Sequence, residues 1–455
     1  MRDTIFYASK DEKITPQEIA HADLARKLAG ECMVLLENDG VLPLKSREEI
    51  ALYGNGVRKT IQGGTGSGSV NTRSITNIEK GFEEAGFTVT NKAWLDANDE
   101  HYKKMQEAYQ EWLEEEGKRR NVPPFLVSFD HPFSEPAPYT ISKEEVAGCK
   151  AKIAVYVISR NSGEGKDRED REGDYLFYPE ELDGIRNLIA GGKKLIVVLN
   201  IGGVMQLTEL KKIIGINAIV LMNQLGNLGG NALVDLISGA VTPSGKLADT
   251  WAVEYKDYPS SATFSHNNGN VDEEYYQEGI YVGYRYFDSF GVTPLYPFGY
   301  GLSYTSFDIK TIKVEQKSEF IAVSVKVRNT GDYYAGKEVV QIYLSKPQGQ
   351  MDMPYQELVA FQKTGELRPG EEECIDLEFP LELLAGYDTD SAAYLVEAGD
   401  YIVRVGADSA STQAAAVLTV KSRTMLKQCE NMSFADEKQE EIKSVRKAVK
   451  EEALW

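Results

Sequence analysis

Cysteine and histidine are scarce in this sequence, with four of each among 455 residues. The cysteines stand far apart and form no CxxC pair, which argues against a zinc cluster and against a dense disulfide framework; they are Cys32, Cys149, Cys374 and Cys429. The histidines show no spacing typical of metal ligands. The sequence therefore predicts a protein that uses no metal and no cofactor.

Long apolar runs are also missing. No stretch reaches the roughly 18 consecutive apolar residues of a membrane-spanning helix, and the first residues, MRDTIFYASKDEKITPQE, contain no apolar core of signal-peptide length. Basic residues are outnumbered, 50 Lys and Arg against 70 Asp and Glu, so the formal net charge is -20. Because such a chain repels phosphates and anionic lipids, nucleic-acid and membrane partners are not expected. A neutral ligand rich in hydroxyl groups would not be repelled, and we expect a cytoplasmic protein.

The first part of the chain alternates strand-like and helix-like segments. Short apolar runs typical of strands buried on both faces begin at Ile50, Lys152, Lys194 and Asn217. Helical patterns cover 19–36, 179–190 and 229–240, and a charged helical insertion at 101–120 is expected to lie solvated beside the sheet. This alternation predicts an α/β fold, a doubly wound sandwich over residues 1–300.

The pattern changes near residue 300. Short segments with period-2 alternation follow, for example FIAVSVKVRN from Phe320 and EVVQIYLS from Glu338. Their spacing is typical of an all-β sandwich, predicted over residues 301–422. Residues 423–455 are charged and are predicted to form a helical tail or linker. Its narrow apolar stripe consists of Ile442, Val445 and Val449, with Leu454 and Trp455 at the end.

Three stretches resemble family 3 glycoside hydrolases of the β-glucosidase type. They are VISRNSGEGKDR (157–168), IQGGTGSGSVN (61–71) and YVGYRYFDSFGVTPLYPFGYGLSYTSF (281–307). They are similar to the acid/base loop of that family, to the glycine-serine loop of its α/β sandwich domain, and to the junction into its fibronectin type III-like domain. The resemblance covers about residues 14–422 and implies that the all-β part is a fibronectin III-like sandwich.

The chain departs from the family pattern in one respect. Family members usually carry a TIM barrel with an aspartate nucleophile in an SDW-like motif, and no SDW occurs in this sequence. A permuted subset of the family has the sandwich and fibronectin-like domains first and the barrel last. The sequence resembles the front half of such a permuted enzyme, so we expect a barrel, in cis or in trans, to supply the nucleophile.

Glu164 is the candidate acid/base residue. It stands between two glycines just after a predicted strand, and the carboxyl ends of strands are where α/β sheets place ligand groups. The resemblance assigns it the role of the family's acid/base glutamate; the alternative is a solvated loop carboxylate. An acid that works near neutral pH needs a raised pKa, which burial under a bound sugar would provide.

Candidate substrate-binding residues flank this glutamate. Arg168 either forms a solvated pair with Asp167, pins the loop through a buried carboxylate, or reaches a sugar hydroxyl. Gly66 and Ser67 belong to the glycine-serine loop, which either approaches the substrate cleft or forms a plain tight turn. Its spacing does not match a phosphate-binding loop, so a nucleotide-binding protein is disfavoured.

The predicted function is retaining hydrolysis of terminal β-D-glucosidic or related β-glycosidic bonds, with this chain supplying the acid/base half. The expected substrate is an oligosaccharide or an aryl or alkyl β-glycoside. The alternative is a non-catalytic carbohydrate-binding or scaffold protein derived from such an enzyme. A barrel with an aspartate nucleophile would distinguish the two.

Overall fold

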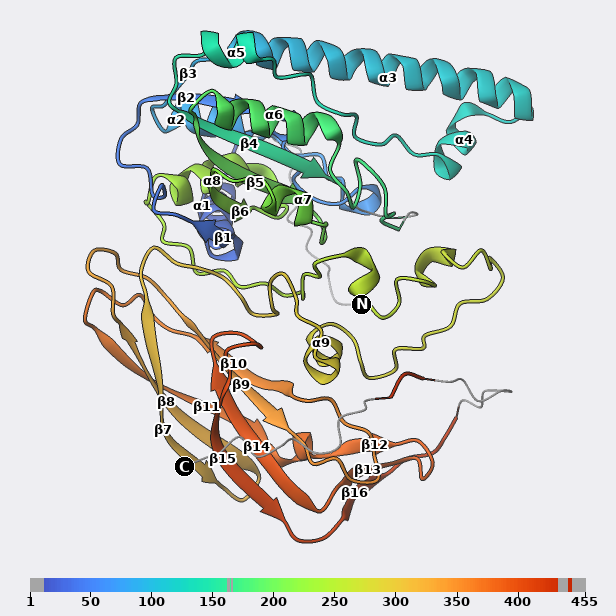
Figure 1. The fold of residues 1–455 in the computed structure, drawn as a ribbon, viewed down its shortest axis with the longest axis vertical. Helices are drawn as coiled ribbons and strands as arrows, with labels where there is room; N and C mark the ends of the chain where they lie inside the picture. Colours follow the sequence, from blue (N-terminus) through green and yellow to red (C-terminus); the bar gives the residue numbers. More distant parts are fainter. Residues whose placement is uncertain (1–11, 162–163, 165–166, 433–440, 444–455) are drawn as a thin grey trace, which may run out of the picture.

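The computed structural model describes residues 12–161, 164, 167–432 and 441–443. An α/β layer lies against a β layer in Figure 1, and the chain passes from one to the other after residue 290. In the described part of the chain, no helix combines the length and the apolar character needed to cross a bilayer.

The first layer is built on a six-stranded sheet of order β1-β6-β5-β4-β2-β3. Its strands are β1 (Val34–Asn38), β2 (Glu49–Tyr53), β3 (Thr88–Val89), β4 (Ile153–Arg160), β5 (Lys194–Ile201) and β6 (Ile216–Leu221). Neighbours are parallel except β1, which runs antiparallel to β6 at the edge. The α/β fold class is therefore confirmed, and the four predicted apolar runs form β2, β4, β5 and β6.

Helices cover both faces of this sheet. The helices of this part of the chain are α1 (Pro16–Cys32), α2 (Ile78–Glu84), α3 (Lys92–Arg120), α4 (Pro124–Asp130), α5 (Lys143–Gly148), α6 (Pro179–Ala190), α7 (Thr208–Lys211) and α8 (Gly229–Ile237). Figure 1 shows α6 on one face and α8 on the other. The central strands β4 and β5 are buried along almost their whole length, which explains their continuous apolar sequences.

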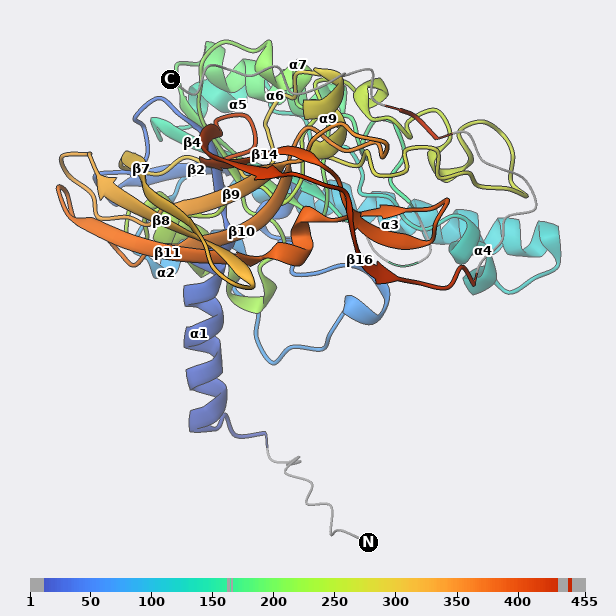
Figure 2. The same ribbon diagram turned by 90° about the horizontal axis from the view of Figure 1, so that it is seen from below.

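The helix predicted over 19–36 is present, but its predicted end is wrong. Helix α1 begins behind a capping box, in which the Thr15 hydroxyl accepts from the Glu18 N–H at 3.2 Å, and it ends at Cys32. Leu36 belongs to strand β1, where pairing with β6 decides its conformation. Ile19, Leu24 and Leu28 are each more than half exposed, because α1 projects from the body (Figure 2). Helical spacing located the helix but gave no information on where the edge strand starts.

The second layer is a β-sandwich with its own core. One sheet has the order β10-β9-β14-β15 and the other β11-β8-β7. The strands are β7 (Phe307–Gln316), β8 (Phe320–Asn329), β9 (Val339–Ser345), β10 (Glu357–Lys363), β11 (Glu372–Pro380), β14 (Gly399–Gly406) and β15 (Gln413–Val420). Burial alternates along β8, as its period-2 sequence predicts, so the all-β half of the fold class is confirmed.

The helical tail predicted from residue 423 is wrong at its start. Residues Thr424–Gln428 form strand β16, which pairs with β13 (Ala393–Val396) beside β12 (Gly386–Asp388) in a small third sheet. Ile442 is described but lies outside any helix, and its N–H donates to the Gln277 carbonyl at 2.9 Å. The rest of the predicted apolar stripe, Val445, Val449, Leu454 and Trp455, lies outside the described residues.

Tyrosines join the two layers. The Tyr296 hydroxyl donates to Glu37 Oε1 at 2.6 Å, and the Tyr304 hydroxyl donates to the Leu236 carbonyl at 2.8 Å. On the other side, the Leu358 N–H of β10 donates to the Tyr284 hydroxyl of α9 (Tyr284–Phe290) at 2.8 Å. The tyrosine-rich junction sequence therefore serves as interdomain packing.

Candidate functional site

The site is built on the loop that follows β4. At the end of this strand, Arg160 and Glu181 of α6 form a two-pronged ion pair with N–O distances of 2.9 and 2.6 Å. Their side chains are only 3% and 5% exposed. The Arg160 guanidinium also donates to the Asp174 carbonyl at 3.1 Å, so the buried pair fastens the base of the loop to the sheet.

A second ion pair closes the loop itself. Arg168 pairs with Asp174 and also donates to the Asp174 carbonyl at 2.8 Å. The other carboxylate oxygen of Asp174 accepts from the Glu169 N–H at 2.9 Å. Of the three uses that the sequence left open for Arg168, the structure therefore shows the loop-pinning one, and its contact with a substrate stays a prediction.

Glu164 meets the glycine-serine loop, although 97 residues separate them in the sequence. The Ser67 N–H donates to Glu164 Oε1 at 3.3 Å, and the Ser67 hydroxyl bonds the same oxygen. Gly66 has a φ of 80°, and a Cβ there would lie 2.6 Å from Glu164 Oε2. Only glycine fits this contact, because a side chain would be strained and would displace the carboxylate. The structure thus brings together Gly66, Ser67 and Glu164.

The pKa of Glu164 moves in the direction opposite to the expected one. The Ser67 hydroxyl and then the Ser67 N–H lower the pKa of this carboxyl, because both hydrogen bonds favour the charged form. Glu164 is exposed, so burial does little to oppose them. On this chain alone the carboxyl is held as an ionised acceptor rather than as a proton donor.

A cavity of about 750 Å³ opens beside Glu164. One side is lined by Thr65, Gly66 and Glu164, and another by Phe129 and Phe133. The sequence analysis did not single out these two phenylalanines, because the charged insertion was expected to lie solvated beside the sheet and to take no part in the site. The recurrence of Phe125, Phe129 and Phe133 directly after the charged helix is the signal that could have identified them.

Glu135 lines the same cavity and was also missed. Burial raises the pKa of its carboxyl, against the hydrogen bond that Oε1 accepts from the Tyr102 hydroxyl at 3.2 Å. Among the described residues, its Oε2 is buried without a hydrogen-bond partner. No group of three or more His, Cys, Asp or Glu side chains placed to hold a metal occurs in the described ranges.

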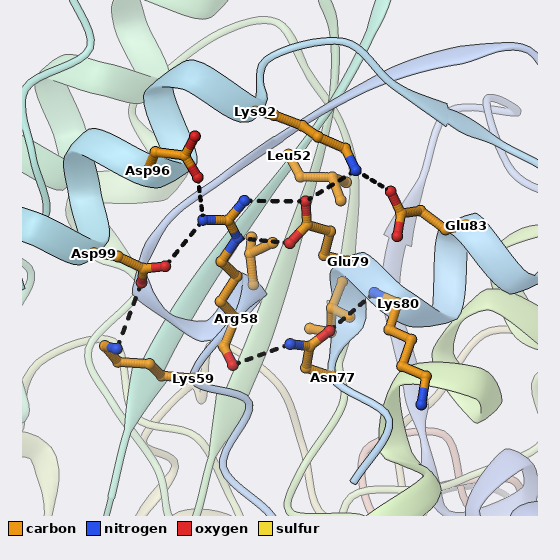
Figure 3. A network of polar contacts seen from close by, with 12 residues as sticks. Leu52, Arg58, Lys59, Asn77, Glu79, Lys80, Glu83, Lys92, Asp96 and Asp99 are labelled. Carbon is orange, nitrogen blue, oxygen red and sulfur yellow. Dashed lines mark hydrogen bonds and ion pairs between the residues drawn. The ribbon is translucent and has the colours of Figure 1, made fainter.

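A polar network fixes the root of the insertion to the sheet domain (Figure 3). The Arg58 guanidinium donates to Glu79 of α2 at 2.6 Å and to Asp96 and Asp99 of α3 at 2.7 and 3.0 Å. These bonds, Glu79 first, raise the pKa of Arg58, which stays charged. Helix α3 therefore leaves the domain from an anchored base.

Comparison with known proteins identifies the family. Residues 33–284 match the model of the glycosyl hydrolase family 3 C-terminal domain, and residues 338–409 match that of the fibronectin type III-like domain. The chain belongs to glycoside hydrolase family 3. Family 3 members are usually completed by a TIM barrel, and the described residues of this chain form none.

Curated family 3 relatives include beta-glucosidase A of Butyrivibrio fibrisolvens and thermostable beta-glucosidase B of Acetivibrio thermocellus. They are 34% and 33% identical over 88% and 89% of this chain, and the alignments cover 51% and 49% of the relatives. The chain also superposes on a solved family 3 structure, that of beta-glucosidase 3B from Thermotoga neapolitana in complex with alpha-D-glucose, with a TM-score of 0.79 at 38% identity. The superposition covers 91% of this chain and 56% of that chain. The chain spans about half the length of these relatives.

A relative named for another activity also matches. The exo-alpha-(1->6)-L-arabinopyranosidase of Bifidobacterium breve is 28% identical over 90% of this chain and 53% of its own length. The family 3 framework therefore does not by itself determine which sugar is cleaved.

Proposed function

We propose that this chain is the acid/base half of a retaining β-glucosidase. The observation that carries the proposal is the placement of Glu164 on an exposed loop at the carboxyl edge of the sheet, held by Gly66 and Ser67 beside a cavity. The beta-glucosidases among the relatives support the reaction class, and the anchored loop supports a carboxylate that must keep its position.

In this proposal Glu164 donates a proton to the glycosidic oxygen while an aspartate of a barrel, in cis or in trans, attacks the anomeric carbon. The bond from that carbon to the leaving oxygen breaks, and a glycosyl-enzyme ester forms. Glu164, now ionised, then takes a proton from water, and the oxygen of that water displaces the aspartate. The two carboxylates must lie about 5–5.5 Å apart for this retaining route.

The low pKa of Glu164 in the open site has a consequence for this cycle. A barrel and a sugar placed over the carboxyl would remove water from it, and desolvation disfavours the charged form. Docking would therefore shift Glu164 from an ionised acceptor to a proton donor. Ser67 would favour the ionised form again for the second step.

The test measures hydrolysis of an aryl β-glucoside by the purified chain, alone and with a family 3 barrel domain joined or added in trans. We expect turnover only when the barrel is present, and its loss in Glu164→Gln. Glu172→Gln is the matched control, since Glu172 is an exposed glutamate on the same loop and is not among the residues lining the cavity.

Three results would contradict the proposal. Turnover by the chain alone would mean that the nucleophile lies within it. Equal effects of the two substitutions would remove Glu164 from the reaction. Binding of a β-glucoside without turnover, with the barrel docked, would favour the alternative of a carbohydrate-binding or scaffold protein.

A further inference from the structure

Helix α4 exposes two phenylalanines, and only one of them faces the candidate site. Phe125 and Phe129 are 60% and 73% exposed, and their ring centroids lie 6.3 Å apart. Phe129 lines the cavity that contains Glu164, whereas Phe125 is not among its lining residues. A single exposed phenylalanine is common on a protein surface, so the informative observation is that Phe129 presents its apolar ring inside the cavity beside Glu164.

Phe129 belongs to an apolar wall of the cavity. Pro132 and Phe133 follow it along the chain and line the same cavity. The Phe133 ring is backed by Tyr109 and Tyr102 of α3, with centroid distances of 5.2 and 5.8 Å. The wall therefore combines an exposed ring, Phe129, with a ring supported from behind, Phe133.

This wall is tied to the helix that carries it. The Tyr109 hydroxyl donates to the His131 carbonyl at 2.7 Å, and Arg120 pairs with Asp130 at 3.1 Å. These contacts hold the end of α4, which carries Phe129, against α3.

The wall is also tied to the acid/base loop. Arg171 of that loop donates to the Ser134 hydroxyl at 3.1 Å, and the Tyr178 hydroxyl donates to the Glu135 carbonyl at 2.8 Å. These bonds hold the apolar wall at a fixed position relative to the loop of Glu164. A ligand that contacts Glu164 in this cavity would meet both surfaces at once.

We propose that Phe129, with Pro132 and Phe133, is the platform for the aglycone, the part of the substrate released with the glycosidic oxygen. This inference rests on the proposed function. The acid protonates the glycosidic oxygen, and the aglycone is attached to that oxygen. A cavity wall beside Glu164 therefore lies next to the aglycone. The sugar that is cleaved would contact the barrel.

The chemistry of the wall defines the class of aglycone. Flat apolar rings bind a flat apolar face, so the platform fits an aryl group or the C–H face of a second hexose. Charged side chains of Arg168 and Asp174 line the same cavity and suit the hydroxyl groups at the rim of such a hexose. A methyl aglycone is too small to reach the platform.

The experiment compares Phe129→Ala with Phe125→Ala in the barrel-completed enzyme. Values of kcat/KM are measured for methyl β-glucoside, phenyl β-glucoside and cellobiose, each relative to the unsubstituted enzyme. For Phe129→Ala we expect a decrease of about three- to tenfold with phenyl β-glucoside and cellobiose, carried by KM, and no change with methyl β-glucoside. Phe125→Ala should behave like the unsubstituted enzyme with all three, and Phe129→Trp should restore the two larger substrates.

The outcomes separate this inference from the function on which it rests. Absence of Glu164-dependent turnover in the unsubstituted enzyme refutes the proposed function and the platform with it. Glu164-dependent turnover combined with equal effects of Phe129→Ala on all three substrates refutes the platform alone. A decrease confined to phenyl β-glucoside, with cellobiose unchanged, would overturn the hexose part of the assignment.

Discussion

The buried ion pair beneath the acid/base loop gives the sharpest stability prediction. Substitution of Glu181 by Ala leaves the Arg160 guanidinium, which is 3% exposed, without its counter-charge. Removing one member of a buried pair costs about 3–5 kcal/mol, because the remaining charge stays desolvated. Glu181 also accepts from the Tyr178 N–H at 2.9 Å, so the start of α6 loses a cap as well.

Urea unfolding followed by tryptophan fluorescence measures this effect. Trp94, Trp112 and Trp251 all precede residue 300, so their signal reports mainly on the α/β domain. With an m-value of about 3 kcal/mol/M, the midpoint should fall by about 1–1.7 M urea. Glu180→Gln, a change at the exposed neighbouring position, should leave the free energy of unfolding within about 0.5 kcal/mol of the original.

A double substitution separates the charge from the packing. Arg160→Met with Glu181→Leu removes both charges and keeps apolar volume, so it should recover most of the lost stability. A midpoint for Glu181→Ala close to that of the original chain would refute the reasoning. So would a double variant as unstable as the single one.

Three further predictions concern the site. Gly66→Ala should lower turnover of the completed enzyme at least tenfold and cost about 1 kcal/mol of stability, since its φ is 80° and its Cβ would meet Glu164. Gly68→Ala, which has open space around its Cβ, should change neither turnover nor stability; enzyme kinetics and urea unfolding measure the two effects. Ser67→Ala should raise the pKa of Glu164 toward its ordinary value, as measured by 13C NMR titration of the carboxyl, and an unchanged pKa would contradict the assigned cause. Burial raises the pKa of Glu135, so its stabilising effect is present below the unfolded-state pKa and lost as the pH rises through the folded-state pKa. Glu135→Gln should therefore gain stability relative to the original chain as the pH rises above about 4, and a pH-independent difference in unfolding free energy would refute this.

The central strands were predictable from the sequence because both of their faces are buried. The runs that begin at Lys152 and Lys194 are apolar without interruption over 153–158 and 195–199, a pattern that surface segments do not show. The edge strands were harder to predict. Val34–Asn38 follows a helix almost without a break, and Thr424–Gln428 is exposed at every residue, so its sequence carries no burial pattern.

Some features of the site were likewise predictable from the sequence and others were not. A loop motif was enough to single out Glu164, Gly66 and Ser67, which the structure brings together. The partner of Arg168 and the lowered pKa of Glu164 depend on which groups meet in space, and the spacing of residues along the chain does not determine that. The aromatic wall was missed because a charged helix on its own gives no indication that its far end returns to the sheet edge.

The role of Glu164 as the acid is tested most directly by measuring how the effect of its substitution on activity depends on the leaving group. In the barrel-completed enzyme, Glu164→Gln and the original chain are compared on cellobiose, whose leaving group needs a proton, and on 2,4-dinitrophenyl β-glucoside, whose leaving group departs without one. We expect a decrease in kcat/KM of about 100-fold or more with cellobiose and a much smaller one with the activated substrate. Equal and mild decreases with both substrates would contradict it.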